Sequence, residues 1–180
     1  MRSEILERLT VPLGSRDHIL GPIDAPITLV EYGDYECPAC GTSHPLVKAI
    51  LGRLGDRLCF GFRHFPLSNV HPHAERAAEA AEAAGAQGSF WEMHDILFEN
   101  QDALDYDDIA EYAAVLGLNV SLLMKAVLAG VYAARIREDF NSGVRSGVNG
   151  TPSFFINGFR YDGMRGFEPM LAALTAAGGW

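Results

Sequence analysis

The stretch ITLVEYGDYECPAC, residues 27–40, decides the fold of this 180-residue chain. Residues 27–32 are rich in β-branched and other apolar side chains, and the glycine- and proline-containing segment 21–26 precedes them as a turn, so we predict a strand there. The strand leads into Cys37 and Cys40, which are separated by two residues. The cysteine pair is therefore predicted at the end of a strand.

A helix is predicted to begin within that cysteine pair and to run to about residue 54. Proline is favoured in the first turn of a helix, as at Pro38, and Leu46, Ile50 and Leu54 repeat every fourth residue on one face. Pro45 should kink this helix, because proline removes one intrahelical hydrogen bond. The first thiol is then placed where the strand ends and the helix starts.

A second strand is predicted at residues 58–65, an apolar stretch that ends before Pro66. Strand, helix and strand form a β-α-β unit, whose two strands are parallel and joined by a right-handed crossover. A region rich in Ala and Glu follows, with helical periodicity interrupted by glycines. We predict its helices at residues 72–84, 89–99, 107–116, 119–129 and 131–147.

Strand character returns at residues 153–156. The dipeptide Asn157-Gly158 favours a two-residue hairpin turn into a further strand at 159–161, and a last helix is predicted at about 167–177. The predicted architecture is α/β, with a helical insertion between the second strand and the strand at 153–156. The predicted division is a core of residues 1–67 and 149–180 and a helical insertion domain of residues 68–148.

Composition and charge are those of a globular protein, with 48% hydrophobic and 21% charged residues. The formal net charge of −9 and the lack of a Lys/Arg cluster argue against nucleic acid or a membrane as a partner. Residues 1–9 lack the apolar core of a secretory signal, and no apolar run approaches the roughly 20 residues that span a bilayer. The sequence as it stands predicts a cytoplasmic location. A chain trimmed of an export signal, and so periplasmic or otherwise extracytoplasmic, would read the same.

Two cysteines at this spacing can be a redox pair, half of a zinc site or a structural disulfide. The start of a helix favours the redox pair, since its unpaired N–H groups and dipole stabilise a thiolate and lower the thiol pKa from about 8.5. Cys37 would then attack a substrate disulfide. Cys40, one turn further on, would resolve the mixed disulfide.

The competing interpretations of the pair need features that the sequence lacks. A zinc site would need two more ligands, and although Cys59 and six histidines are present, there is no second C-x-x-C and no pair of histidines at zinc-ligand spacing. A structural disulfide between residues three apart would close a very small loop and constrain the unfolded chain little. We therefore expect no metal and no organic cofactor. Cys59, in an apolar strand, is interpreted as a small buried hydrophobe.

Four motifs together resemble one family. They are VEYGDYECPAC at residues 30–40, FRHFPL at 62–67, FWEMH at 90–94 and GTPSFFING at 150–158. In this combination the chain resembles the DsbA-like thiol–disulfide oxidoreductases of the thioredoxin superfamily, over about residues 20–177. The resemblance implies a thioredoxin fold interrupted by an α-helical domain.

The resemblance also implies roles for individual residues. Thr151-Pro152 resembles the cis-proline loop that faces the cysteine pair and offers its backbone to an extended substrate. With Pro38 and Ala39, these two residues would form the substrate-binding surface. Glu31 resembles the family's buried acid, which can relay a proton to or from Cys40. Without the resemblance, Glu31 would be an ordinary polar strand residue that bonds at a sheet edge.

Some residues depart from the family pattern. The dipeptide Pro38-Ala39 lacks the histidine of strongly oxidising periplasmic members, and Thr151 stands where Val often precedes the cis-proline. These departures and the missing export signal put the direction of the reaction in doubt. For a chain without a signal we expect a reduction potential in the reducing half of the range between thioredoxin and DsbA.

The function expected is disulfide exchange with protein or small-molecule thiols, reset by an unidentified redox partner. One alternative is a glutathione-linked isomerase or transferase on the same fold, although such relatives generally use a single serine or cysteine. The other is a non-enzymatic peptide- or zinc-binding module. Several side chains are interpreted without a role in catalysis. They are His44 as exposed or capping, His71 and His73 in a solvated loop, and Phe90, Trp91 and Phe98 in the core of the insertion.

Overall fold

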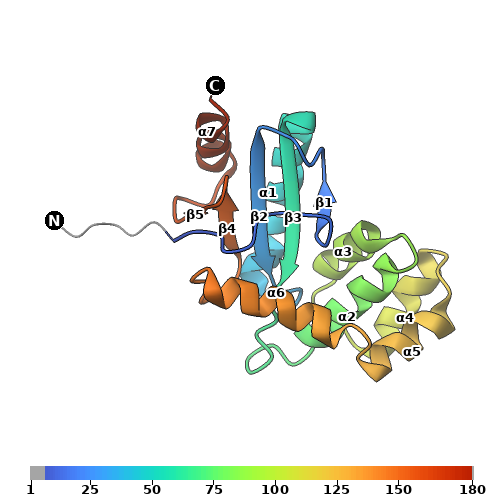
Figure 1. Ribbon diagram of the computed structural model, residues 1–180. Coiled ribbons are helices and arrows are strands. Elements are labelled where there is room, and N and C mark those ends of the chain that lie inside the picture. The colour runs from blue at the N-terminus through green and yellow to red at the C-terminus, as the bar shows by residue number, and fades with distance from the viewer. Residues whose placement is uncertain (1–6, 180) are drawn as a thin grey trace.

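A five-stranded sheet forms the centre of the computed structural model, which describes residues 7–179 (Figure 1). The strands are β1 (His18–Leu20), β2 (Ile27–Gly33), β3 (Leu58–His64), β4 (Ser153–Ile156) and β5 (Phe159–Tyr161). Their order is β1-β3-β2-β4-β5; β2 and β3 are parallel and the other neighbours are antiparallel. The strands predicted from 27, 58, 153 and 159 are confirmed. β1 was not predicted, because three half-buried residues are too few to show an alternating pattern.

Alternation along β2 assigns its side chains to two different cores. Ile27 and Leu29 belong to the larger core, which includes helix α1 (Pro38–Leu54) and helix α7 (Phe167–Ala177). Val30 and Tyr32 belong to a smaller core on the other face. Because alternate residues of a strand share a face, Glu31 lies on the side of α1. The parallel pairing of β2 with the fully buried β3 fixes this arrangement.

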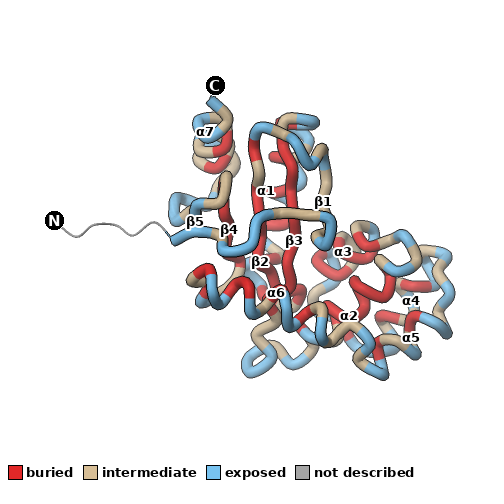
Figure 2. Tube along the Cα trace, in the orientation of Figure 1, coloured by how far each residue is buried: buried red, intermediate tan, exposed pale blue. Residues whose placement is uncertain are grey.

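Five helices lie between β3 and β4. They are α2 (Ala74–Gly85), α3 (Phe90–Glu99), α4 (Tyr106–Val115), α5 (Val120–Ala129) and α6 (Ala133–Arg145). Each lies within two residues of its predicted bounds at both ends. Helices α2 to α5 gather beside the sheet, whereas α6 crosses in front of it (Figure 1). Buried side chains are concentrated in β2, β3 and α2 (Figure 2), where alanines allow the helices to approach closely.

The hairpin turn has its predicted conformation, and the active-site helix has its predicted bounds, while the kink at Pro45 stays a prediction. Asn157 and Gly158 both have positive φ, 47° and 82°, as a two-residue hairpin turn requires. Helix α1 runs through Pro45 without a break. Of residues 1–9, which lack the apolar core of a secretory signal, residues 1–6 lie outside the described part. Within residues 7–179, no helix combines the length and apolar character needed to cross a bilayer.

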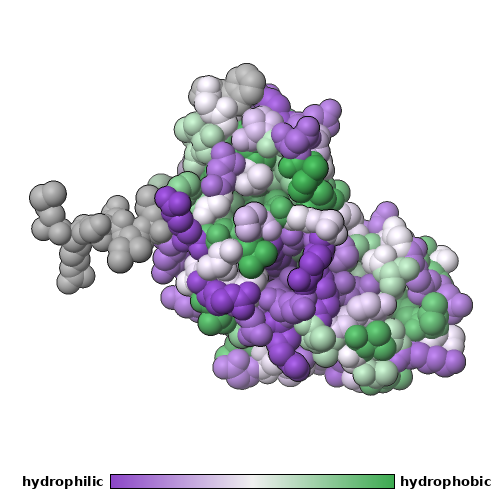
Figure 3. All heavy atoms as spheres, in the orientation of Figure 1, coloured by the Kyte–Doolittle hydropathy of each residue, from purple (hydrophilic) through white to green (hydrophobic). Residues whose placement is uncertain are grey.

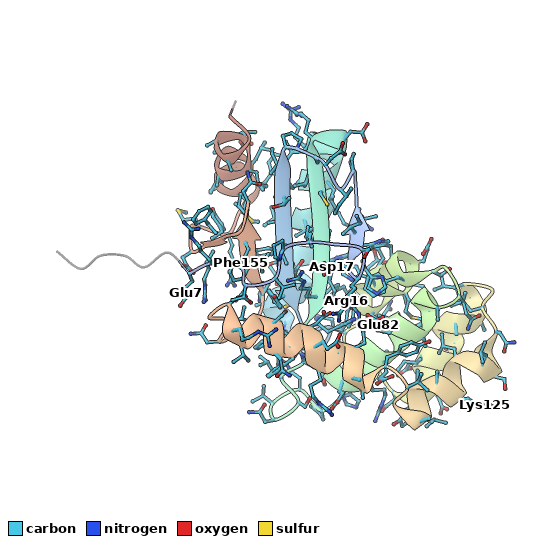
Figure 4. The ribbon with its side chains drawn as sticks, in the orientation of Figure 1. Glu7, Arg16, Asp17, Glu82, Lys125 and Phe155 are labelled. Carbon is cyan, nitrogen blue, oxygen red and sulfur yellow. The ribbon has the colours of Figure 1, made fainter. Side chains whose placement is uncertain are left out.

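Buried charges join the sheet to the helices. The Glu82 carboxylate on α2 lies 3.0 Å from His18 Nε2 and 2.8 Å from His64 Nε2. Arg63 on β3 is 2% exposed and donates to both carboxylate oxygens of Asp17, at 2.7 and 3.0 Å. Asp17 and Glu82 are labelled in Figure 4, near the junction of the sheet with the helical region. Arg63 and His64 are therefore both engaged in this junction.

The surface differs between the sheet and the helical tip. Hydrophilic side chains cover much of the face around α6, while apolar groups appear over the α4–α5 tip (Figure 3). Val115, Leu122 and Leu128 are among the exposed apolar residues of this tip.

Candidate active site

Cys37 is the residue that caps the N-terminus of α1. Its backbone is extended, with φ −74° and ψ 119°, and Pro38 follows at the first helical position. Cys37 N–H donates to the carbonyl of Asp34 at 3.1 Å, so the loop from β2 turns tightly into the helix. The sulfur is thus held at the positive end of the helix, where unpaired N–H groups favour a negative charge.

The immediate surroundings of Cys37 favour its thiolate. Hydrogen bonding from the Cys40 thiol is the largest cause that lowers the pKa of Cys37, to about 5, and burial opposes it. The Thr151 side chain lowers the same pKa, and the Thr151 hydroxyl has no hydrogen-bond partner among the described residues that would draw it away from Cys37. In the protonated form, the Cys37 thiol donates to the Thr151 carbonyl oxygen at 3.5 Å. At neutral pH the Cys37 thiolate is therefore the dominant form.

Cys40 has the opposite character. Its side chain is fully buried, and burial is the largest cause that raises its pKa; the hydrogen bond to Cys37 and the nearby Glu31 carboxylate raise it further. Both cysteines are free thiols in the structure. One sulfur is thus ionised and the other keeps its proton, as a nucleophile and a resolving thiol require.

Glu31 is buried on β2, with 2% of its surface exposed. Burial raises its pKa to about 8, the Arg165 guanidinium lowers it, and Cys37 raises it. The Oε1 atom has no hydrogen-bond partner among the described residues. The sheet-edge alternative is therefore wrong, since β2 lies between β3 and β4. A carboxyl group with a pKa near neutrality beside two thiols can accept or donate a proton.

The Thr151–Pro152 peptide bond is cis, and it directly precedes β4. Antiparallel pairing of Tyr32 with Ser153 brings this loop to the end of β2 from which the cysteine loop leaves. Pro152 is buried, whereas Pro38 and Ala39 are exposed beside Cys37. The structure thus brings Thr151 against Cys37 and leaves Pro38 and Ala39 accessible to a substrate.

Two polar residues that sequence reasoning missed hold the active-site loop. The Asp34 carboxylate accepts from the N–H groups of Glu36, at 2.8 Å, and Leu67, at 2.9 Å. Gln101, in the turn after α3, donates to the carbonyls of Tyr35 and Cys37, both at 2.8 Å. No local pattern marks Gln101, because its partners lie more than 60 residues away.

Three histidine interpretations are corrected. His71 Nδ1 lies 2.7 Å from Asp34 Oδ2, and His73 Nδ1 lies 2.7 Å from Glu36 Oε1, so neither is simply solvated. His44 is neither exposed nor capping, because it lies inside α1 with 7% of its surface exposed. The acidic partners of these histidines are distant in sequence or on another element, so the sequence alone did not reveal the pairs.

The residues that the sequence analysis interpreted as core residues are buried, except for one that is only partly buried. Cys59 is fully buried in β3, as expected of a small hydrophobe. Phe90 and Phe98 are buried, and Phe98 packs against Tyr35, so it joins the helices to the active-site loop. Trp91 is only partly buried and packs against Phe60 of the sheet.

Comparison with known proteins agrees with this geometry. A family model described as Thioredoxin matches residues 14–176. BdbD from Bacillus subtilis superposes with a TM-score of 0.82 at 20% identity, over 97% of this chain and 98% of that one. Alpha-DsbA1 of Wolbachia pipientis gives 0.80 at 21% identity, over 95% and 94%. The chain belongs to the Thioredoxin family and has the fold of DsbA-like proteins.

A relative that is named as an antiporter has a higher sequence identity to this chain than the two solved structures. The chain is 46% identical over 176 residues to the Na(+)/H(+) antiporter NhaA 1 of Salinispora arenicola. This match covers 97% of the chain and 27% of the relative. The chain therefore spans about a quarter of the length of this relative.

The low pKa of Cys37 predicts fast alkylation in weak acid. The rate of reaction with iodoacetamide should rise through a pH midpoint of about 5, because the thiolate is the reactive form. Thr151→Val should move the midpoint upward by removing a hydrogen-bond donor, and Cys37→Ser should abolish the reaction. A midpoint near the pKa of free cysteine, about 8.5, would contradict the proposed environment.

Burial of Glu31 predicts a pH-dependent cost to stability. Its folded-state pKa, about 8, lies above its ordinary value of 4.5, so the unfolded chain ionises first and stability falls as pH rises between these values. Glu31→Gln should therefore raise the free energy of unfolding on the order of 3 kcal/mol at pH 8 and little at pH 4. Urea unfolding of the reduced protein measures this. The exposed Glu111→Gln serves as the control, and equal effects of the two variants would argue against a buried ionisable Glu31.

Proposed function

We propose that the chain is a thiol–disulfide oxidoreductase that acts on protein or small-molecule thiols and disulfides through Cys37 and Cys40. The observation that carries the proposal is the contrast between the two sulfurs. Hydrogen bonding lowers the pKa of Cys37 to about 5, whereas burial raises the pKa of Cys40. This asymmetry assigns attack to the first thiol and resolution to the second.

The reaction then follows two balanced displacements. The Cys37 thiolate attacks one sulfur of a substrate disulfide, forming a mixed disulfide and releasing the other sulfur as a thiolate that takes up a proton. The ionised form of Glu31, which a pKa of about 8 leaves as the minor form at neutral pH, takes the proton of Cys40, and the Cys40 sulfur attacks Cys37. The Cys37–Cys40 disulfide forms, the second substrate sulfur leaves as a thiolate that takes this proton from Glu31, and two electrons have passed to the substrate. The reverse sequence delivers a disulfide, and a redox partner resets the pair.

The exposed Pro38 and Ala39 and the Thr151-Pro152 loop support a substrate bound across the nucleophile. An extended peptide can lie along this loop and place its own sulfur near Cys37. The antiporter name describes a relative of which this chain matches about a quarter. The proposal concerns the chemistry of the cysteine pair within that quarter.

Trapping of a mixed disulfide tests the proposal. Cys40→Ser, incubated with insulin, should accumulate a covalent adduct through Cys37 that dithiothreitol releases, because the resolving thiol is missing. Non-reducing gels and mass spectrometry detect it, and Cys37→Ser should form none. Equal labelling of both variants would overturn the assignment of roles. Full turnover by Cys40→Ser with glutathione would favour the glutathione-linked alternative.

The direction of exchange depends on the reduction potential of the pair. A stabilised thiolate favours the reduced form, so a Cys37 pKa of about 5 favours a more oxidising protein than the sequence suggested. We expect a potential between the thioredoxin value of about −270 mV and the DsbA value of about −120 mV, toward the middle. Equilibration with glutathione buffers measures it. A value at or below that of thioredoxin would contradict this expectation.

A further inference from the structure

Three potential metal ligands converge behind the cysteine pair, on two different helices. His44 comes from α1, and His94 and Asp95 come from α3. One ligand atom of each side chain lies within 4.8 Å of the other two. The thiol chemistry described above uses none of these side chains.

Both imidazoles are buried, and Nε2 of His44 is unpartnered among the described residues. His44 is 7% exposed, and its Nε2 has no hydrogen-bond partner among the described residues; it lies 3.3 Å from Asp95 Oδ1. His94 is 3% exposed, and its Nδ1 lies 3.0 Å from the Tyr35 hydroxyl. That contact leaves Nε2 of His94 as the nitrogen available to a metal. A metal-binding histidine usually holds a second group on its other nitrogen in this way.

Space for an ion is present beside these ligands. A cavity of about 160 Å³ is lined by His44, His94 and Asp95, together with apolar side chains of α1 and β3. One water occupies about 30 Å³ of liquid, so an ion and a completing water fit. Tetrahedral zinc ligands lie roughly 3.4 Å apart, and the three ligand atoms lie within 4.8 Å of one another, so the side chains need to close by at most about 1.4 Å.

We propose that His44, His94 and Asp95 bind one divalent transition-metal ion, with Zn²⁺ as the best match. Two imidazole nitrogens and one carboxylate oxygen suit zinc, and a water would complete four-coordination. The hard cation Mg²⁺ requires oxygen ligands and is excluded by this set.

Lys48 is the natural competitor for the ion. Its Nζ lies 2.7 Å from Asp95 Oδ2, so the ammonium group forms an ion pair with the carboxylate that would bind the metal. The Lys48 side chain is about half exposed, 48%, and its flexible stem can turn toward solvent. Metal binding must release this ammonium group from Asp95. Removal of the lysine charge should therefore strengthen binding.

The site would connect metal binding to the active-site loop. An ion held by α1 and α3 fixes the catalytic helix against the helical region. Tyr35, which bonds His94, lies two residues before Cys37, and its ring packs against Phe62. Occupancy of the site would therefore restrain the loop that presents the nucleophile.

Zinc titration of the full chain tests the proposal. Cys37→Ser/Cys40→Ser serves as the background, so that the active-site thiols cannot bind the metal. Calorimetry should show one Zn²⁺ per chain, and Asp95→Asn or His44→Phe should weaken binding at least about tenfold. Phenylalanine keeps an aromatic ring against Phe98, which stacks on His44 at 5.0 Å. Lys48→Met should bind zinc more tightly than the background protein.

Controls separate a specific site from adventitious binding. Glu92→Gln removes a carboxylate charge as Asp95→Asn does, on an exposed residue of the same helix outside the ligand set, and should leave the affinity within about twofold. Mg²⁺ should give no binding heat at the concentrations used for zinc. Absent zinc binding, an unchanged affinity in Asp95→Asn, or no gain in Lys48→Met would each overturn the proposal. Because the background lacks the catalytic thiols, these outcomes are independent of the proposed oxidoreductase function.

Discussion

The hydrogen bond between the Cys40 thiol and the Cys37 sulfur is the interaction on which the chemistry of this protein depends. It is the largest cause of the low pKa of Cys37, and it also contributes to the high pKa of Cys40. Charge is thus held on the outer sulfur and a proton on the inner one. The cost of burying Cys37 opposes this arrangement, so the helix N-terminus and Thr151 must add to it. The sheet and α1 hold Cys37, Cys40 and Thr151 at the positions that these interactions need.

Glu31 is a buried carboxyl group whose ionisation costs the fold stability. A carboxyl group with 2% exposure and an unpartnered oxygen disfavours the folded state once it is ionised. The Arg165 guanidinium lowers the pKa of Glu31 and also donates to the Pro152 carbonyl at 3.0 Å. The cis-proline loop and the buried acid therefore share one cation.

Local sequence patterns predicted most of the fold. Burial sets the spacing of apolar residues along each strand and helix, and backbone geometry favours particular residues at helix starts and turns. Three short patterns each predict their own local structure: the apolar residues before Cys37 a strand, the proline after it a helix start, and Asn157-Gly158 a hairpin turn. The missed features are long-range polar contacts. Gln101 reaches the carbonyl of Cys37, and His71 reaches Asp34, yet no spacing rule links these pairs. Glu31 was identified only through the family resemblance, since an acid in a strand is otherwise unremarkable.

The helical region is part of the active site rather than a cover for the sheet. Gln101 holds the backbone of Cys37, Phe98 packs on Tyr35, and His94 bonds the Tyr35 hydroxyl. Each contact reaches the loop between β2 and α1 from residues that follow β3 in sequence. A shift of α3 relative to α1 would therefore move the backbone of the loop that carries Cys37. In this architecture the position of that loop is set partly by residues outside the β-α-β unit that carries the cysteines.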